Sequence, residues 1–157
     1  MDITCIRVKI FEERDREERL RAFVSVTFDH VFVVRDIKVL EGSMGQFVAM
    51  PSRKLTDKCP QCGGKNHLRA DHCNQCGTEL ADDRAVKDAN GRAKLYADVA
   101  HPINPRFREH LTERILTAYE KELDLSKLPG YVCTYDIYDN ARSSVEARQE
   151  EFGAGIL

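Results

Sequence analysis

Two copies of a Cys-x-x-Cys-Gly motif, with ten residues between Cys62 and Cys73, constrain this chain more than any other feature of its sequence. The spacing inside each copy lets one tight turn direct two sulfur atoms at a common point, and the glycine lets backbone N–H groups approach the thiolates. Two such turns facing each other complete the closed tetrahedron of a structural zinc site. The sequence therefore predicts one Zn²⁺ ion per chain with four thiolate ligands, Cys59, Cys62, Cys73 and Cys76.

The same pattern disfavours a redox or catalytic role for this segment. Paired knuckles of this kind are not typical of merely reduced or redox-active thiols. Four cysteines already fill the coordination shell, so His67 and His72, which lie between the motifs, have no ligand position left. A catalytic zinc keeps a position open for water, and no glycine-rich phosphate loop or nucleophile–base pair can be identified elsewhere. We therefore expect a structural metal and no enzymatic activity.

The composition is that of a globular protein in a reducing compartment. Its 157 residues, of which 42% are hydrophobic, suffice for one core and a small appendage. No run of 18 apolar residues occurs and residues 1–4 do not resemble a signal peptide, so we expect a cytoplasmic protein without membrane contact. Cys5 and Cys133 are then interpreted as small buried side chains rather than disulfide partners.

Charge alone leaves the partner undecided. The formal net charge of −2 gives no global argument for nucleic-acid binding. Residues 1–127 hold 22 Lys and Arg against 21 Asp and Glu, whereas residues 128–157 hold 2 against 5. The net negative charge thus lies in the tail, and the nearly neutral remainder can still present a basic face.

Alternating apolar and polar residues predict an α+β protein on a mainly antiparallel sheet. Ile6, Val8 and Ile10 alternate with charged residues, and the period of two recurs on both sides of the polar break at Asp29 and His30, which indicates a hairpin. About five strands are expected, at residues 3–11, 20–28, 31–40, 46–50 and 95–100, with the last able to pair with 46–50.

One long amphipathic helix follows the sheet. Asn104 before Pro105 is typical of a helix start, and apolar residues continue at helical spacing to about Leu123. The remaining segments carry weaker patterns. We expect a solvated turn at 12–19, a further strand at 131–138, a helix-friendly stretch at 141–152 and poor order at 153–157.

Two strings on either side of the cysteine segment resemble a known family. The first begins at Phe32 and ends with FVAMPSRK at residues 47–54, and the second is AHPIN at residues 100–104. Both are similar to strings of the SpoVG family of bacterial regulators, and the resemblance spans residues 1–54 and about 96–122. It implies a small α/β protein that forms a homodimer, binds DNA and RNA, and belongs with the septation or sporulation proteins.

The resemblance divides the chain into three parts. Residues 1–54 and 95–125 form a discontinuous SpoVG-like core, residues 55–94 are an inserted zinc-ribbon module, and residues 126–157 are a C-terminal extension, expected to be partly disordered. A usual member of the family has a short polar loop in place of the insertion. Lengthening a loop costs only about 0.6 kcal/mol per doubling, so the core should tolerate the module. The module is too short to bury a core and must take its folding free energy from zinc.

Cationic residues at two places are candidate phosphate contacts. Ser52, Arg53 and Lys54 offer a hydroxyl and two charges, and although composition alone would make them a solvated loop end, the family resemblance favours nucleic acid. Arg106 and Arg108 lie near the helix start, where backbone N–H groups also favour anions. A solvated helical face is an equal alternative for this second pair.

Two hypotheses of function follow. The leading one is a dimeric regulator that binds DNA or RNA, in which the zinc module extends the contact surface. The alternative is a protein-interaction adaptor, in which the zinc module and the acidic tail recruit a protein partner without nucleic acid. Zinc ribbons serve both roles, so the ribbon itself does not discriminate between them.

Overall fold

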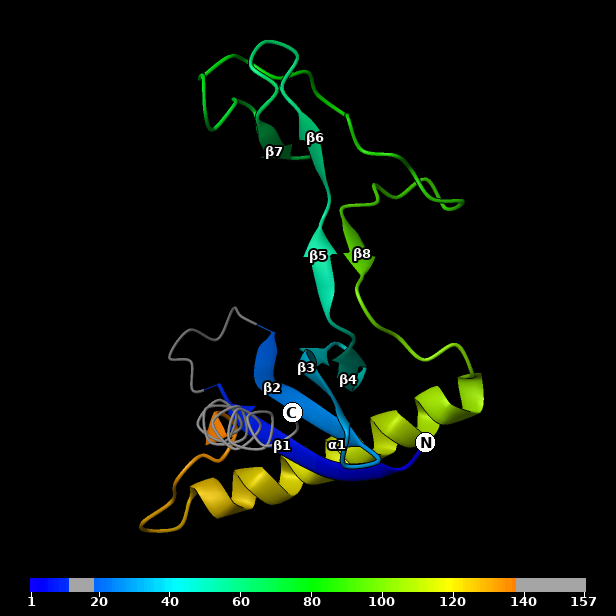
Figure 1. The fold of residues 1–157 in the computed structure, drawn as a ribbon, viewed down its shortest axis with the longest axis vertical. Coiled ribbons are helices and arrows are strands. Elements are labelled where there is room, and N and C mark those ends of the chain that lie inside the picture. Colours follow the sequence, from blue (N-terminus) through cyan, green and yellow to red (C-terminus); the bar gives the residue numbers. More distant parts are fainter. Residues whose placement is uncertain (12–18, 138–157) are drawn as a thin grey trace, which may run out of the picture. The chain divides into compact units, whose positions relative to one another are not determined.

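The computed structural model describes residues 1–11 and 19–137 and divides the chain into two compact units (Figure 1). Met1–Ala49 and Pro102–Leu157 make up the first, which we call the sheet unit. Met50–His101 make up the second, which contains both cysteine motifs and which we call the ribbon unit. Each unit has its own strands and its own buried residues, and each is described separately.

The sheet unit contains one antiparallel sheet with the strand order β1-β2-β3-β4. A short loop joins β2 to β3, and its residues Asp29 and His30 have φ values of 49° and 57°, as the polar break in the sequence suggested. Another tight turn joins β3 to β4, with Gly45 at a φ of 112°. The strands are β1 (Ile3–Ile10), β2 (Leu20–Phe28), β3 (Phe32–Gly42) and β4 (Gly45–Ala49).

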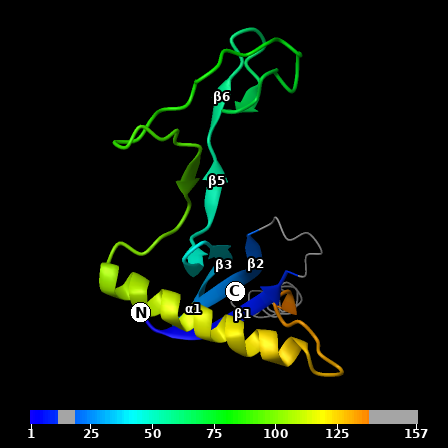
Figure 2. The same cartoon turned by 180° about the vertical axis from the view of Figure 1, so that it is seen from behind.

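The core of the sheet unit lies between one face of this sheet and the helix. Side chains of β2 alternate between the two faces of the sheet, and four on the helix side are buried: Ala22, Val24, Val26 and Phe28. The ring of Phe28 lies 6.1 Å from the ring of Phe107 in the helix, which identifies the face that the helix covers. Figure 2 shows the helix from the side on which it crosses the sheet.

The helix α1 (Pro105–Ser126) begins where the sequence predicts. The side chain of Asn104 accepts a hydrogen bond from the N–H of Phe107 at 3.0 Å, and Pro105 occupies the first turn. Leu111, Ile115 and Tyr119 are buried, as expected for one stripe of an amphipathic helix. No helix within residues 1–11 and 19–137 has both the length and the apolar character that a membrane span requires.

The ribbon unit contains two small antiparallel ladders. The first pairs β5 (Ser52–Lys54) with β8 (Tyr96–Asp98), and Leu55 N–H continues it with a 2.8 Å hydrogen bond to the carbonyl of Leu95. The second pairs β6 (Thr56–Lys58) with β7 (Lys65–His67), directly beside the first cysteine motif. The predicted insertion, residues 55–94, therefore lies wholly inside this unit.

The structure confirms the α+β class with its antiparallel sheet and single long helix, and corrects two details. The segment 95–100 does not pair with 46–50, because β4 pairs with β3 and β8 pairs with β5, so the main sheet has four strands. Residues 131–137 contain no strand; they contact the sheet through the carbonyl of Thr134, which accepts from Arg7, and the hydroxyl of Tyr135, which accepts from the N–H of Asp36. The predicted turn at 12–18, residue 138 and the segments at 141–152 and 153–157 lie outside the described residues.

We predict that replacing residues 55–94 with a short glycine-rich turn leaves the sheet unit folded. The hydrogen bond from Leu55 to Leu95 holds the two ends of the segment together, and the buried residues of the sheet unit all lie outside it. Circular dichroism should show a cooperative thermal transition like that of the parent. Loss of that transition would mean that the insertion is part of the core.

Candidate metal centre

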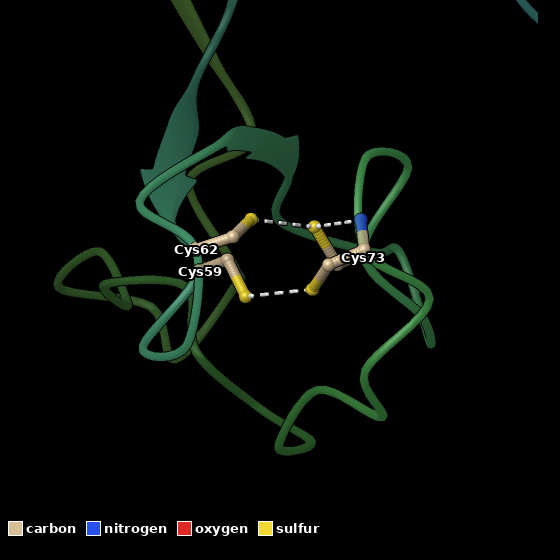
Figure 3. Close-up of side chains that lie close together, drawn as sticks. Cys59, Cys62 and Cys73 are labelled. Atoms are coloured by element: carbon tan, nitrogen blue, oxygen red, sulfur yellow. Dashed lines mark hydrogen bonds between the residues drawn. The ribbon is translucent and has the colours of Figure 1, made fainter.

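Four sulfur atoms converge inside the ribbon unit. The Sγ atoms of Cys59, Cys62, Cys73 and Cys76 all lie within 4.8 Å of one another, and among the described residues they form the one such group of potential metal ligands. Two sulfur pairs bridge the motifs, Cys59 with Cys76 at 3.7 Å and Cys62 with Cys73 at 3.5 Å (Figure 3). A tetrahedron with metal–sulfur bonds of about 2.3 Å has edges of about 3.8 Å, whereas a disulfide bond is about 2.05 Å. The separations therefore fit a shared metal ion and not a disulfide.

Each motif folds into the same turn. In the first, Gly63 N–H donates to the carbonyl of Cys59 at 2.9 Å, and in the second, Gly77 N–H donates to the carbonyl of Cys73 at 3.0 Å. These glycines have φ values of 75° and 76°, in the left-handed region that side chains disfavour. Both turns thus need a positive φ at the residue after the second cysteine, which explains why glycine stands there in each motif.

Backbone N–H groups point at the sulfur atoms. Gln61 N–H donates to Cys59 and Gln75 N–H donates to Cys73, both at 3.4 Å, and Gly64 N–H donates to Cys62 at the same distance. Hydrogen bonds to a charged acceptor favour its charged form. The turns are therefore built to stabilise thiolates, which are the form that binds a metal.

The thiols of Cys62 and Cys73 differ in acidity because their hydrogen-bond partners and neighbouring thiols differ. The N–H of Cys76 and the side-chain amide of Asn66 hydrogen-bond to the sulfur of Cys73 and lower the pKa of Cys73 to about 5. The hydrogen bond from Gly64 N–H is the largest single influence on Cys62 and lowers its pKa, but the other three cysteines and burial together outweigh it and raise the pKa of Cys62 to about 12. A divalent cation at the centre offsets the repulsion among four thiolates.

Two polar side chains link the motifs to each other. Asn66, only 3% exposed, donates to Cys73 Sγ at 3.3 Å and accepts from the N–H of Asn74 at 2.8 Å. Thr78 donates its hydroxyl to Gln61 Oε1 at 2.6 Å. Sequence spacing gave no signal for these residues, because their partners belong to the opposite motif.

A largely buried arginine joins the segment after the second motif to the β6–β7 ladder. Arg84 donates from Nε to Asp57 at 2.7 Å and from its two terminal nitrogens to the backbone carbonyls of three residues, His67, Ala70 and Ala81. Its side chain is only 15% exposed. The guanidinium group thus satisfies four acceptors from separate parts of the module.

The two histidines between the motifs are not in the sulfur cluster. The Nδ1 atom of His67 accepts a hydrogen bond from the N–H of Arg69 at 3.1 Å. His72 lies in an isolated β-bridge with Glu79. Neither is among the side chains close enough to share an ion with the cysteines.

The candidate phosphate contacts lie in both units. Ser52, Arg53 and Lys54 make up β5 and are all exposed. In the register of the ladder, Lys54 lies opposite Tyr96, whose side chain is 51% exposed. Tyr96 was not singled out by the sequence, although an exposed aromatic residue across from a cation is a familiar feature of nucleic-acid contacts.

Arg106 and Arg108 are exposed in the first turn of α1, in the sheet unit. One terminal nitrogen of Arg108 donates to the carbonyl of Pro102 at 3.3 Å.

Comparison with known proteins gives a consistent result. A sequence model of the SpoVG family matches residues 1–121. The "Putative septation protein SpoVG" of Clostridium beijerinckii is 36% identical over 130 residues, which cover 83% of this chain and 100% of that protein. The proteins of the same name from Lachnospira eligens and Clostridioides difficile are 37% and 35% identical, over 77% and 78% of this chain and 93% and 91% of their own lengths.

We predict that Arg84→Lys loosens the module although the charge is retained. A lysine nitrogen cannot reach Asp57 and three separate carbonyls together, and leaving such groups without partners costs about 2–3 kcal/mol. Hydrogen exchange of the amides in β6 and β7 should become faster. The exposed Arg92→Lys change is the matched control and should leave exchange unaltered. Equal exchange in both variants would contradict the role assigned to Arg84.

Proposed function

The chain belongs to the SpoVG family, and from this premise we propose that it is a dimeric nucleic-acid-binding regulator whose insertion folds around one structural zinc ion. The proposal has three parts, which concern the metal, the nucleic acid and the second copy of the chain. The relatives reported above carry the name "Putative septation protein SpoVG", and nothing in that name denotes an enzyme. We accordingly propose a binding protein that works in the cytoplasm and catalyses no reaction.

The metal part rests on the spacing and chemistry of the sulfur atoms. Four thiolates in a closed cluster are the ligand set typical of structural zinc, and sulfur separations of 3.5 and 3.7 Å are close to the edges of a zinc–thiolate tetrahedron. The ion would be held by Cys59, Cys62, Cys73 and Cys76. Bound there, it supplies the cross-link between the two turns.

The nucleic-acid part rests on the exposure and register of β5. Arg53 and Lys54 are adjacent cations at the end of the FVAMPSRK string, and both side chains are exposed. Lys54 has Tyr96 opposite it, so a charge for phosphate and a ring for a base occur as one cross-strand pair. Ser52 adds a hydroxyl on the same strand, and Arg106 with Arg108 offers a further anion site at the start of α1.

The proposal of a dimer rests on the outer edge of the sheet, at β4. Among the described strands, β4 pairs with β3 alone, so its other edge carries backbone groups available for pairing. Phe47 of β4 and Met44 of the preceding turn are exposed apolar side chains at that edge. We propose that a second copy of the chain covers this edge.

We predict one zinc ion per chain in protein purified without added metal. Cys73→Ser should remove the ion and disorder the ribbon unit, because a serine hydroxyl is a poor zinc ligand and the small module depends on the cross-link. Elemental analysis measures the stoichiometry. Cys133→Ser is the matched control, since Cys133 lies outside the cluster, and it should retain the ion. A parent protein that is folded and free of metal would refute this part.

We predict that Arg53→Ala with Lys54→Ala weakens binding to DNA and RNA of any sequence. Removing two phosphate contacts should reduce the magnitude of the salt slope by about two on duplex DNA, because fewer counterions are released. Binding to random-sequence pools across a salt series measures both effects. Arg106→Ala with Arg108→Ala is the parallel test of the helix start.

The control for charge is Lys121→Ala with Lys127→Ala, an equal loss of exposed charge at the other end of α1. This variant should bind as the parent does. If the Arg53/Lys54 variant keeps the parental affinity at every salt concentration, those residues do not contact the nucleic acid. If the parent binds neither pool at any salt concentration, the adaptor hypothesis takes the place of nucleic-acid binding.

A further inference from the structure

The sheet face opposite α1 carries an aromatic ring between two lysines. Phe28 faces the helix, so Phe23, an odd number of residues away on the same strand, faces the other side. The register places Lys9 of β1 and Lys38 of β3 on either side of Phe23 in one row across three strands. Both lysines are exposed, and Phe23 is half-buried.

A second ring extends this row. The ring of Phe11, at the end of β1, meets that of Phe23 edge to face, with centroids 6.3 Å apart and an interplanar angle of 85°. A four-stranded antiparallel sheet with a helix on one face and rings among cations on the other is an arrangement on which unpaired bases can stack. A base would use the ring, and its phosphates would use the flanking lysines.

The neighbouring row is covered by the chain itself. Residues 134–136, which follow the helix, lie on this face, where Arg7 donates to the carbonyl of Thr134 at 2.9 Å. Tyr135 is only 4% exposed, and its ring lies 5.0 Å from the guanidinium carbon of Arg35. The Tyr135 hydroxyl also lies 3.4 Å from the carboxylate of Asp36.

The next residue places a negative charge between two cations. The carboxylate of Asp136 lies 3.4 Å from Lys9 Nζ and 3.5 Å from a terminal nitrogen of Arg35, so it joins β1 to β3 across β2. The Lys9 and Asp136 side chains are 51% and 61% exposed. Exposed ion pairs of this kind contribute little to stability, so the contact is one that another anion can replace.

Tyr135 and Asp136 together present an aromatic ring and a negative charge, as a nucleotide does. An aromatic ring stacks on a guanidinium group, and an adjacent anion lies between a lysine and an arginine. A base and its phosphate would satisfy the same groups. Lys9 of the Lys9–Phe23–Lys38 row also contacts Asp136, so this row adjoins the row that the chain covers, and the two form one continuous surface.

We propose that this face of the sheet is a binding surface for single-stranded nucleic acid, part of which Tyr135 and Asp136 occupy until nucleic acid displaces them. The proposal rests on the proposed function for the class of its ligand and adds a surface to β5 and the start of α1. Single strands are favoured because the bases of a duplex are already stacked and present no open ring face along its length. The C-terminal segment then acts as a built-in competitor.

The test compares a fluorescent single-stranded oligonucleotide with the duplex of the same sequence. In the full chain, Tyr135→Ala with Asp136→Ala should raise the affinity for the single strand about tenfold, because the competitor is gone and the full row is open. Affinity for the duplex should stay unchanged. Asp124→Ala is the control for the loss of one negative charge, since it lies on α1, against the opposite face.

Substitutions of Phe23 provide a second test of the proposal. In the Tyr135→Ala, Asp136→Ala background, Phe23→Leu should lower single-strand affinity about tenfold, which is the loss of one stacked base, whereas Phe23→Tyr should retain it. In the parent background the effect of Phe23→Leu should be smaller. Circular dichroism on every variant confirms that the fold persists.

Two results would overturn the proposal. One is a folded double variant that binds the single strand with the parental affinity, and the other is Phe23→Leu matching Phe23→Tyr in that background. If the double variant unfolds because Tyr135 is buried, Asp136→Ala alone decides, with a severalfold gain expected and no gain counting against the proposal. Binding by the parent that depends on Arg53 and Lys54, without any gain on releasing the segment, would reject this surface and leave the proposed function standing.

Discussion

The convergence of four sulfur atoms on one point is the constraint on which the ribbon unit depends. Its buried apolar residues are few, since Cys59, Cys73 and Leu80 form a small cluster with Ala70 packed against it. Two of those residues are themselves members of the sulfur group, so the metal we propose would stabilise the centre of the only cluster found in the described part of this unit. The glycine turns, the N–H···S hydrogen bonds and the two side chains that link the motifs all help to hold the four sulfur atoms together.

The sheet unit is stabilised by apolar packing and not by a metal, so the two units have different sources of stability. Its core needs no metal, because alternate residues of β2 are buried against α1 in the ordinary manner of a sheet covered by a helix. A net charge of −2 conceals where the cations lie, on β5, at the start of α1 and on the sheet face opposite the helix. These are three surfaces that an anionic polymer can reach, and the function we propose uses them all.

The sequence predicted the features that depend on local patterns. The motif spacing indicated the sulfur cluster, Asn104 before Pro105 indicated the start of the helix, and alternation indicated the hairpin around Asp29. Features that depend on partners distant in the chain gave no local signal. The pairing of β8 with β5 follows from register in space, and the contacts of Arg84 and Tyr135 join segments that no periodicity connects. The helix-friendly stretch at 141–152 lies outside the described residues and stays a prediction.

The central claim is that a metal with sulfur ligands alone folds the insertion. X-ray absorption at the zinc K-edge, on protein purified without added metal, reads the coordination shell directly. We expect four sulfur neighbours at about 2.3 Å and no nitrogen or oxygen bound to the metal. A shell that includes nitrogen at about 2.0–2.1 Å would contradict the claim, because a histidine would then have taken the place of one of the four cysteines.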